Sequence, residues 1–261
     1  MLASPAYDIA LLADKGRRDT QEDAIAARVF DAAKAGYVVI ADGMGGHEAG
    51  EIASGLVIAN WQAVLDDLLE DGAGSGAAML DALPLAAMQA NAAVAGHAQA
   101  QPQGFNMGST LLGVLMLGPR LFWISIGDSP LYLFREGRLT QINEDHSMAP
   151  VIDAQARDGQ ISAEEARTHP NRNQLTSVIM GGAIPKVDCP EAPLDLRRGD
   201  IVIAASDGLQ YLGDADIRTI LQAQGENLAQ DIADALLREL NRVGDPDQDN
   251  VSIAVIKPAN I

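Results

Sequence analysis

The chain has 261 residues, 48% of them hydrophobic but only 4% aromatic, so it can bury a sizeable core made of Ala, Leu, Val and Ile. Its 36 Asp and Glu residues outnumber its 18 Lys and Arg, and the net charge of −18 disfavours nucleic acid and anionic membrane surfaces as partners. The single Cys189 permits no internal disulfide, and neither a signal peptide nor a run of roughly 18 apolar residues is evident, so a soluble cytoplasmic protein is expected.

Two strands are expected in the first thirty residues, at 7–13 and 24–30. The loop between them contains the polar cluster Arg18-Asp19-Thr20-Gln21-Glu22-Asp23. Such a cluster is ordinarily a solvated loop with local ion pairs of little energetic value. The functional interpretation is an arginine fork for phosphate beside carboxylates that serve a metal, and the loop alone does not favour it.

A third strand is predicted at 37–41, where an apolar, β-branched run leads directly into Asp42 and a glycine-rich turn. An Asp that caps a turn explains one such motif. The pattern of an aspartate beside an apolar run recurs, however. The run at 201–205 leads into Ser206-Asp207-Gly208, and Asp249 precedes the run at 251–256. Because a buried carboxylate is costly unless it is paired or holds a cation, three strand-end aspartates suggest one oxygen-rich metal site.

The middle of the chain predicts two helices followed by antiparallel hairpins. Helices are expected at 48–69 and 77–100, with Pro84 starting or kinking the second one. Strands are expected at 109–117, 121–126, 131–135 and 138–142, separated by short turns. Asp128 lies in one of these turns, where local hydrogen bonding is its ordinary explanation.

The strand pattern stops between residues 145 and 186. Ser162 and Glu165 have the spacing of a capping box, which predicts a short helix at 162–166. Long insertions of this kind are often functional lids. The sheet resumes at 201–205, two helices follow at 214–224 and 226–243, and the last strand is at 251–256. With no internal repeat or low-complexity linker, one α+β domain covering residues 1–261 is favoured.

The three aspartates, Asp42, Asp207 and Asp249, suit a hard cation, because no Cys–His cluster with zinc spacing accompanies them. Carboxylates, a glycine carbonyl and water are ligands for Mn²⁺ or Mg²⁺. Two such ions can activate a water and clamp the oxygens of an in-line displacement at phosphorus, while an arginine holds the other phosphate oxygens. A phosphomonoester hydrolase is therefore a plausible function.

The ordered motifs resemble the PP2C-type (PPM) Ser/Thr phosphatase family in its bacterial form, over roughly residues 8–256. They are Arg18-Asp19-Thr20-Gln21-Glu22-Asp23, Ala41-Asp42-Gly43-Met44-Gly45-Gly46-His47, Gly108-Ser109-Thr110, Gly127-Asp128-Ser129, Asp145-His146-Ser147, His169-Pro170, Ser206-Asp207-Gly208 and Asp249-Asn250. The resemblance implies a sandwich of two antiparallel β-sheets flanked by helix pairs, with the metals at one end and residues 145–186 as a flap.

The resemblance also implies a role for each site residue. Asp42 bridges two core ions, Gly43 adds its backbone carbonyl, and Arg18 binds the substrate phosphate. The remaining implied metal-site residues are Asp207 and Asp249 on one ion, Glu22 and Asp23 holding waters around the other, and Asp128 at a third, weaker ion. The implied partners are phosphorylated proteins and a cognate bacterial Ser/Thr kinase, and a monomer is expected.

Several positions depart from the family pattern. Gln21 stands where Asn is common, and Met44 stands where eukaryotic relatives have a His proposed as general acid, so the proton donor is unassigned. His47 is interpreted as structural, and Met180-Gly181-Gly182 leaves the substrate preference open. The alternatives are a catalytically silent phosphoprotein-binding regulator, which should lack some metal carboxylates, and a phosphatase specialised for partner-switching regulators or a secretion-system kinase substrate.

Overall fold

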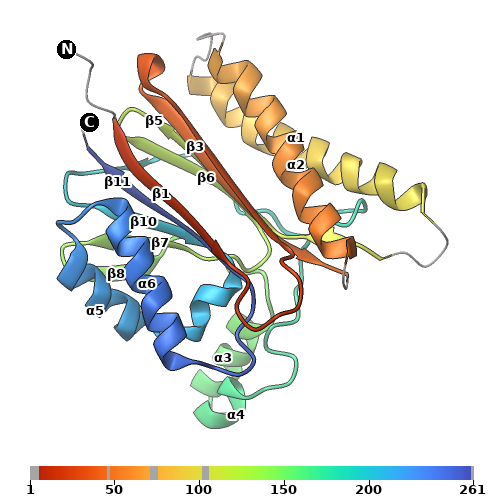
Figure 1. Ribbon diagram of the computed structural model, residues 1–261. Helices are drawn as coiled ribbons and strands as arrows, with labels where there is room; N and C mark the ends of the chain where they lie inside the picture. Colours follow the sequence, from red (N-terminus) through yellow and green to blue (C-terminus); the bar gives the residue numbers. More distant parts are fainter. Residues whose placement is uncertain (1–5, 46–47, 71–75, 102–105, 260–261) are drawn as a thin grey trace.

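Two antiparallel β-sheets lie face to face in the computed structural model, which describes residues 6–45, 48–70, 76–101 and 106–259 (Figure 1). The strand order of the first sheet is β1 (Tyr7–Asp14), β11 (Val251–Pro258), β10 (Ile201–Ala205), β7 (Leu131–Arg135), β8 (Arg138–Gln141). The order of the second is β2 (Asp23–Phe30), β3 (Ala35–Met44), β5 (Leu111–Leu117), β6 (Arg120–Ile126), β9 (Leu194–Asp195), with β4 (Gly108–Ser109) paired to the end of β3.

A helix pair covers the outer face of each sheet. The pairs are α1 (Glu48–Glu70) with α2 (Gly76–Gln99) on the second sheet, and α5 (Asp214–Gln224) with α6 (Ala229–Val243) on the first. The remaining helical elements are η1 (Asp31–Ala33), α3 (Ala149–Arg157), α4 (Ala163–Arg167) and the 3₁₀ turn η2 (Asp207–Tyr211). The predicted α+β sandwich of two antiparallel sheets flanked by helix pairs is confirmed.

The central strands are apolar throughout because both of their faces are buried. In β3, Tyr37 and Val39 belong to the core under α1 and α2, whereas Val38 and Ile40 belong to the core between the sheets. In β10, Ile203 packs under α5 and α6. A strand buried on both faces has no polar alternation, and this explains the uninterrupted runs in the sequence.

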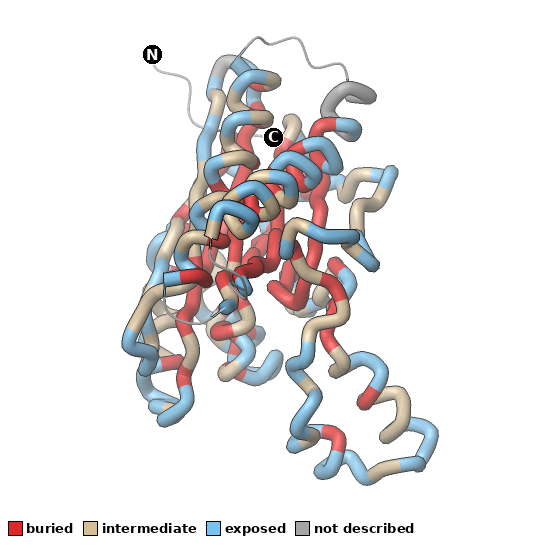
Figure 2. The backbone as a smooth tube through the Cα atoms, turned by 90° about the vertical axis from the view of Figure 1, so that its right-hand side faces the viewer, coloured by how far each residue is buried: buried red, intermediate tan, exposed pale blue. Residues whose placement is uncertain are grey.

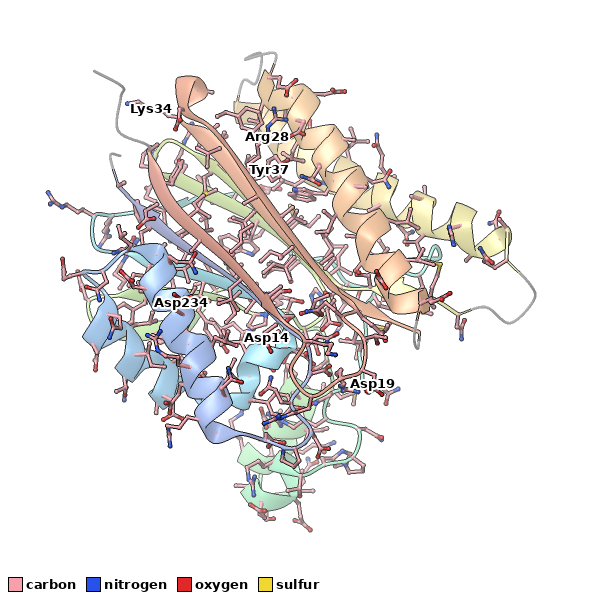
Figure 3. The ribbon with its side chains drawn as sticks, in the orientation of Figure 1. Asp14, Asp19, Arg28, Lys34, Tyr37 and Asp234 are labelled. Atoms are coloured by element: carbon pink, nitrogen blue, oxygen red, sulfur yellow. The ribbon has the colours of Figure 1, made fainter. Side chains whose placement is uncertain are left out.

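Helix α1 is fitted closely to the second sheet. Trp61 is fully buried, and a Cβ placed on Gly113 of β5 would lie 2.1 Å from its ring. Asp66 accepts a hydrogen bond of 2.7 Å from Tyr37 Oη and pairs with Arg28 at 2.7 Å (Figure 3). Among the described helices, α1 alone has the length and apolar composition of a membrane span, but its apolar side chains form this core.

The structure corrects several expected elements. Helix α2 runs through Pro84, which faces solvent and neither starts nor ends it, because Leu83 and its neighbours are held in the core. The strand expected at 109–117 is split into β4 and β5 at Thr110, and α6 begins at Ala229 rather than 226. Helix α3 was not expected, whereas α4 has the predicted capping box between Ser162 and Glu165.

One end of the sandwich carries the loops that hold most of the predicted site residues. The loop after β1, the turn after β6, η2 and the segment before β11 all lie there, and α3 and α4 extend beyond it (Figure 1). Figure 2 shows the segment with α3 and α4 as a lobe that projects from the body and is largely exposed. Functional groups are therefore carried by loops on a rigid double-sheet scaffold.

Candidate metal and phosphate site

A cavity of about 750 Å³ opens at this end of the sandwich. Figure 3 shows Asp14 and Asp19 there, with Lys34 at the opposite end of the β2–β3 hairpin. Seven of the predicted site residues line the cavity: Arg18, Glu22, Asp42, Gly43, Asp128, Asp207 and Asp249. The chain thus brings together carboxylates that are more than two hundred residues apart in sequence.

Asp42 lies within β3, one residue beyond the apolar run, rather than in the turn after the strand. Its backbone N–H donates to Thr110 Oγ1 at 2.9 Å, and its carbonyl accepts from the Thr110 N–H at 2.9 Å. Thr110 Oγ1 also contacts Ser129 Oγ at 2.9 Å, which links this strand to the turn of Asp128. Burial, followed by the negative charges of Asp207 and its neighbours, raises the pKa of Asp42 well above its ordinary value.

Gly43 has no room for a side chain. A Cβ would lie 2.1 Å from the carbonyl oxygen of Gly50 and 2.6 Å from that of Glu22. The Gly43 N–H donates to the Glu22 carbonyl at 3.1 Å, which holds the loop before β2 against β3. The glycine therefore allows the approach of backbone segments that places Glu22 on the cavity wall.

Asp207 opens η2, separated from the end of β10 by Ser206, and the backbone there is packed against the segment before β11. A Cβ on Gly208 would lie 2.0 Å from the carbonyl oxygen of Asn250. One carboxylate oxygen of Asp207, Oδ1, is buried, and no residue that the structure describes forms a hydrogen bond with it. Burial and the charge of Asp249 raise the pKa of Asp207, and the contact with the Asp42 carboxyl lowers it.

Asp249 pairs with Arg18, whose Nη2 lies 2.6 Å from Asp249 Oδ2. The neighbouring Asn250 fixes the loop that carries Arg18: its Nδ2 donates to the carbonyls of Lys15 and Thr20, each at 2.9 Å. Its Oδ1 accepts from the Glu22 N–H at 2.7 Å. Sequence reasoning quoted Asn250 only as part of a motif and assigned it no role.

Asp23 lies behind the cavity instead of on its wall. It faces Asp42 across the β2–β3 pair, and Ser206 Oγ donates to its Oδ2 at 2.7 Å. Its other oxygen is buried and has no hydrogen-bond partner among the described residues. Burial raises its pKa to about 7, against the lowering effect of the Ser206 hydroxyl.

Asp128 follows Gly127, which has a φ of 110°. The turn is held by His146, whose N–H donates to the Gly127 carbonyl at 3.0 Å and whose Nδ1 accepts from the Gly127 N–H at 3.3 Å. His146 is buried, and its carbonyl accepts from Thr176 Oγ1 at 2.7 Å, so it also anchors the flap segment. Sequence reasoning assigned this histidine no role. Burial and the charge of Asp207 raise the pKa of Asp128 to about 8.

The flap closes one side of the cavity with Asn173, Leu175, Val178 and Met180. It is fastened to the body where Ser109 and Ile179 exchange backbone hydrogen bonds of 2.9 and 3.0 Å. Asn91 Oδ1 of α2 accepts from the Gly181 N–H at 2.8 Å. Gly46 and His47, named in the motif after β3, lie outside the described residues.

The donor set fits a hard divalent cation. Within the described part of the chain, no three His, Cys, Asp or Glu side chains already stand at ligand spacing around one point. The carboxylates nevertheless share one cavity, and the two partnerless buried oxygens of Asp23 and Asp207 are of the kind that a cation or its waters would satisfy. Because the donors are all oxygen, they suit Mn²⁺ or Mg²⁺ better than Zn²⁺.

Comparison with known proteins gives consistent matches. The family model described as protein phosphatase 2C matches residues 16–245. The serine/threonine protein phosphatase PstP of Mycobacterium tuberculosis is 38% identical over 224 residues, which are 85% of this chain and 40% of that protein. The chain thus spans less than half the length of that relative.

Two solved structures have the same fold. The catalytic domain of PstP in complex with two manganese ions has a TM-score of 0.76 at 32% identity, with 96% of this chain and 97% of that chain covered. The S. agalactiae serine/threonine phosphatase has a TM-score of 0.80 at 28% identity, with 97% of this chain and all of that chain covered.

Proposed function

Because the chain belongs to the protein phosphatase 2C family, we propose that it is a metal-dependent phosphatase that hydrolyses phosphoserine and phosphothreonine in proteins. The observation that carries the proposal is the convergence of Arg18 and five of the predicted metal-site carboxylates on one cavity. The manganese-bound structure of a relative supports a divalent cation as the cofactor.

We assign the metal-holding roles as follows. Asp42 and the Gly43 carbonyl would hold two core ions, with Asp207 and Asp249 as further ligands of one and Glu22 serving the other. Asp23 would orient water from behind the wall, and Asp128 would hold a third, weaker ion. When bound, two such ions activate water and neutralise the phosphate charge.

The substrate role belongs to Arg18. Its side chain is 56% exposed and lines the cavity, in a position to hold two non-reacting phosphate oxygens with its planar guanidinium. Water adds to phosphorus, the serine or threonine oxygen leaves with a proton, and inorganic phosphate is released. Among the described residues no histidine lines the cavity, so we assign the leaving-group proton to a water in the site.

Further proposals concern the metal used in the cell, the opposing kinase and the domain organisation. We propose that Mn²⁺ or Mg²⁺ serves in the cell, and that the protein opposes a cognate Ser/Thr kinase as a cytoplasmic monomer. Residues 1–261 are proposed to form one phosphatase domain with residues 145–186 as its flap. The presence of every predicted metal-site carboxylate supports an active enzyme over a catalytically silent regulator.

The test is hydrolysis of a phosphothreonine peptide by the purified chain with Mn²⁺, with Mg²⁺ and with EDTA. We expect phosphate release that depends on the metal. Asp207→Ala should reduce kcat by more than about a hundredfold, since even outer partners of metal ligands are worth up to that amount. Asp67→Ala, an exposed carboxylate on α1, is the control. Wild-type rates for a folded Asp207→Ala protein would refute the assignment.

A further inference from the structure

A second cavity of about 940 Å³ adjoins the first and shares Arg18, Asp128, Asn173, Asp207 and Asp249 with it. Its outer part lies between the flap helices α3 and α4 on one side and η2 with the start of α5 on the other. A polypeptide whose phosphorylated residue enters the first cavity can therefore place neighbouring residues in this second one. The roles proposed for the second cavity rest on the function proposed above.

The outer part of this cavity is unusually rich in arginine for so acidic a chain. Four arginines line the cavity, Arg18, Arg157, Arg167 and Arg172, together with six aspartates, Asp128, Asp145, Asp153, Asp207, Asp214 and Asp249. Three of these aspartates belong to the proposed metal site. Apart from the residues shared with the first cavity, three arginines and three aspartates line it, whereas in the whole chain 36 acidic residues outnumber 18 basic ones.

The three flap arginines differ in what they already bind. Arg172 is a structural link, because its guanidinium makes two hydrogen bonds, of 2.6 and 3.0 Å, to the Asp153 carboxylate. Arg167 pairs with Glu164 at 2.6 Å on the same short helix, and both side chains are about 70% exposed. A pair so exposed is worth little and exchanges readily for a better anion.

Arg157 is the available cation. It lies exposed at the end of α3, and within the described residues no ion pair shorter than 4.0 Å occupies it. The carboxylate nearest to it along α3 is Asp153, which already makes both of its hydrogen bonds to Arg172. The Asp153 pKa is lowered by the hydrogen bonds of Arg172 first, and the charge of Arg157 is the smallest of its causes. Arg157 therefore presents to the cavity a guanidinium that makes no ion pair within the described residues.

We propose that Arg157, assisted by Arg167, forms a second anion subsite that holds a phosphate or carboxylate on the substrate polypeptide, a few residues from the phosphoresidue being hydrolysed. A guanidinium binds either group by donating paired, charge-assisted hydrogen bonds to its oxygens. The subsite makes the enzyme select acidic or multiply phosphorylated segments. Because the contact is partly exposed, the preference decreases as salt concentration rises.

The first experiment measures kcat/KM with Mn²⁺ on three peptides that share one phosphothreonine and differ at flanking positions: neutral residues, glutamates, or a second phosphothreonine. We expect the two anionic peptides to be preferred. Arg157→Gln should reduce kcat/KM for these peptides about three- to tenfold, mainly through KM, and leave the neutral peptide unchanged. Comparison of the glutamate and phosphothreonine peptides shows which anion the subsite takes.

Matched variants make the result specific. Arg157→Lys keeps the charge and should retain part of the preference, whereas Arg198→Gln removes an exposed arginine outside both cavities and should have no effect. Equal kcat/KM for neutral and anionic peptides in the wild type would overturn the proposal, as would an equal loss in Arg198→Gln.

A second readout does not depend on hydrolysis. Fluorescence anisotropy would measure binding of the same peptides with the phosphothreonines replaced by a phosphonate that cannot be cleaved. We expect Arg157→Gln to weaken only the anionic peptides. If no peptide is hydrolysed but this selective loss is seen, the proposed phosphatase function fails and the subsite stands. If the three peptides bind equally to the wild type, the subsite fails whatever the hydrolysis assay shows.

Discussion

Arg18 illustrates how a single side chain can serve two partners at the site. Its ion pair with Asp249 measures 2.6 Å, but the two side chains are 56% and 31% exposed. Exposed ion pairs contribute at most about 1 kcal/mol, because water screens the charges. A phosphate dianion that offers several oxygens can therefore displace the Asp249 carboxylate from the guanidinium, which frees that carboxylate for a cation.

Arg18→Ala is expected to raise KM for a phosphopeptide by about tenfold or more and to change kcat less, because the guanidinium binds phosphate without making the nucleophile. Steady-state kinetics with Mn²⁺ provide the measurement. Arg17→Ala is the matched control, since Arg17 is exposed and lines neither cavity. An unchanged KM for Arg18→Ala, with a raised KM for Arg17→Ala, would transfer the phosphate role to Arg17.

Two polar residues, Asn250 and His146, show the limit of local sequence reasoning at this scale. The Asn250 amide fastens the loop of Lys15 and Thr20, more than two hundred residues away in sequence. His146 holds the turn of Gly127 and the start of the flap. Motif membership was the only signal for either residue, because hydrogen bonds between distant segments leave no periodicity in the chain.

At the level of elements, the fit of α1 on the second sheet depends on a large residue, Trp61, that packs over a glycine, Gly113, which has no side chain. The Trp61 ring occupies the space over Gly113 of β5, and both belong to the layer that positions β3 and therefore Asp42. Close packing of this kind tolerates no added atom without displacement of the helix or the strand.

Gly113→Ala is expected to destabilise the protein by about 1–3 kcal/mol, since the new Cβ would overlap the Trp61 ring. Gly55→Ala, in α1 with open space around it, should stabilise by about 0.5–1 kcal/mol through helix propensity. Chemical denaturation of both variants measures the difference. A neutral Gly113→Ala would mean that the Trp61 ring moves aside freely, contrary to a tightly packed layer.

The substitution Ser162→Ala tests the N-terminal cap of the flap helix α4. Ser162 Oγ accepts from the Glu165 N–H at 3.1 Å, and Glu165 Oε2 accepts from the Ser162 N–H at 2.7 Å. Loss of the cap should cost about 1 kcal/mol, confined to α4. Hydrogen exchange should be faster at the amides of α4 and unchanged in β5 and β10. Uniformly faster exchange in all three would show that the flap unfolds only together with the sheets.

The whole molecule accommodates an acidic site in an already acidic chain. Burial raises the pKa values of Asp23 to about 7, Asp207 to about 6 and Asp128 to about 8, from an ordinary value of 3.8. Without cations, the folded chain thus binds more protons than the unfolded chain between pH 4 and 8. The stability of the metal-free protein must therefore decrease as pH rises through this window.

Thermal unfolding in EDTA should show this decrease, with a Tm that falls by about 5 °C or more from pH 5 to pH 8. Saturating Mn²⁺ should remove most of the fall, because a bound cation favours the ionised carboxylates and binds only the folded state. Asp207→Asn should have a shallower slope in EDTA. A Tm in EDTA that is flat or rises over this range would contradict the coupling of these carboxylates.

The elements that could be predicted from sequence are those specified by local patterns. The apolar runs of β3 and β10, the helical periodicity of α1 and the capping box of α4 are each contained within a few residues. Helix α3 and the continuity of α2 through Pro84 could not be predicted, because packing against neighbouring segments overrides the local preference.

The sequence alone therefore determined the family motifs, because these depend on residue type and order, and the resemblance that they carry predicted the two-sheet fold class and the candidate carboxylates. Only the tertiary structure decided that Asp23 lies behind the cavity wall, that Arg18 pairs with Asp249, and that Arg157 faces a second cavity with no ion pair among the described residues. These relations depend on burial and on distances between segments far apart in the chain, and such distances are fixed only when the two sheets, the loops and the flap pack together.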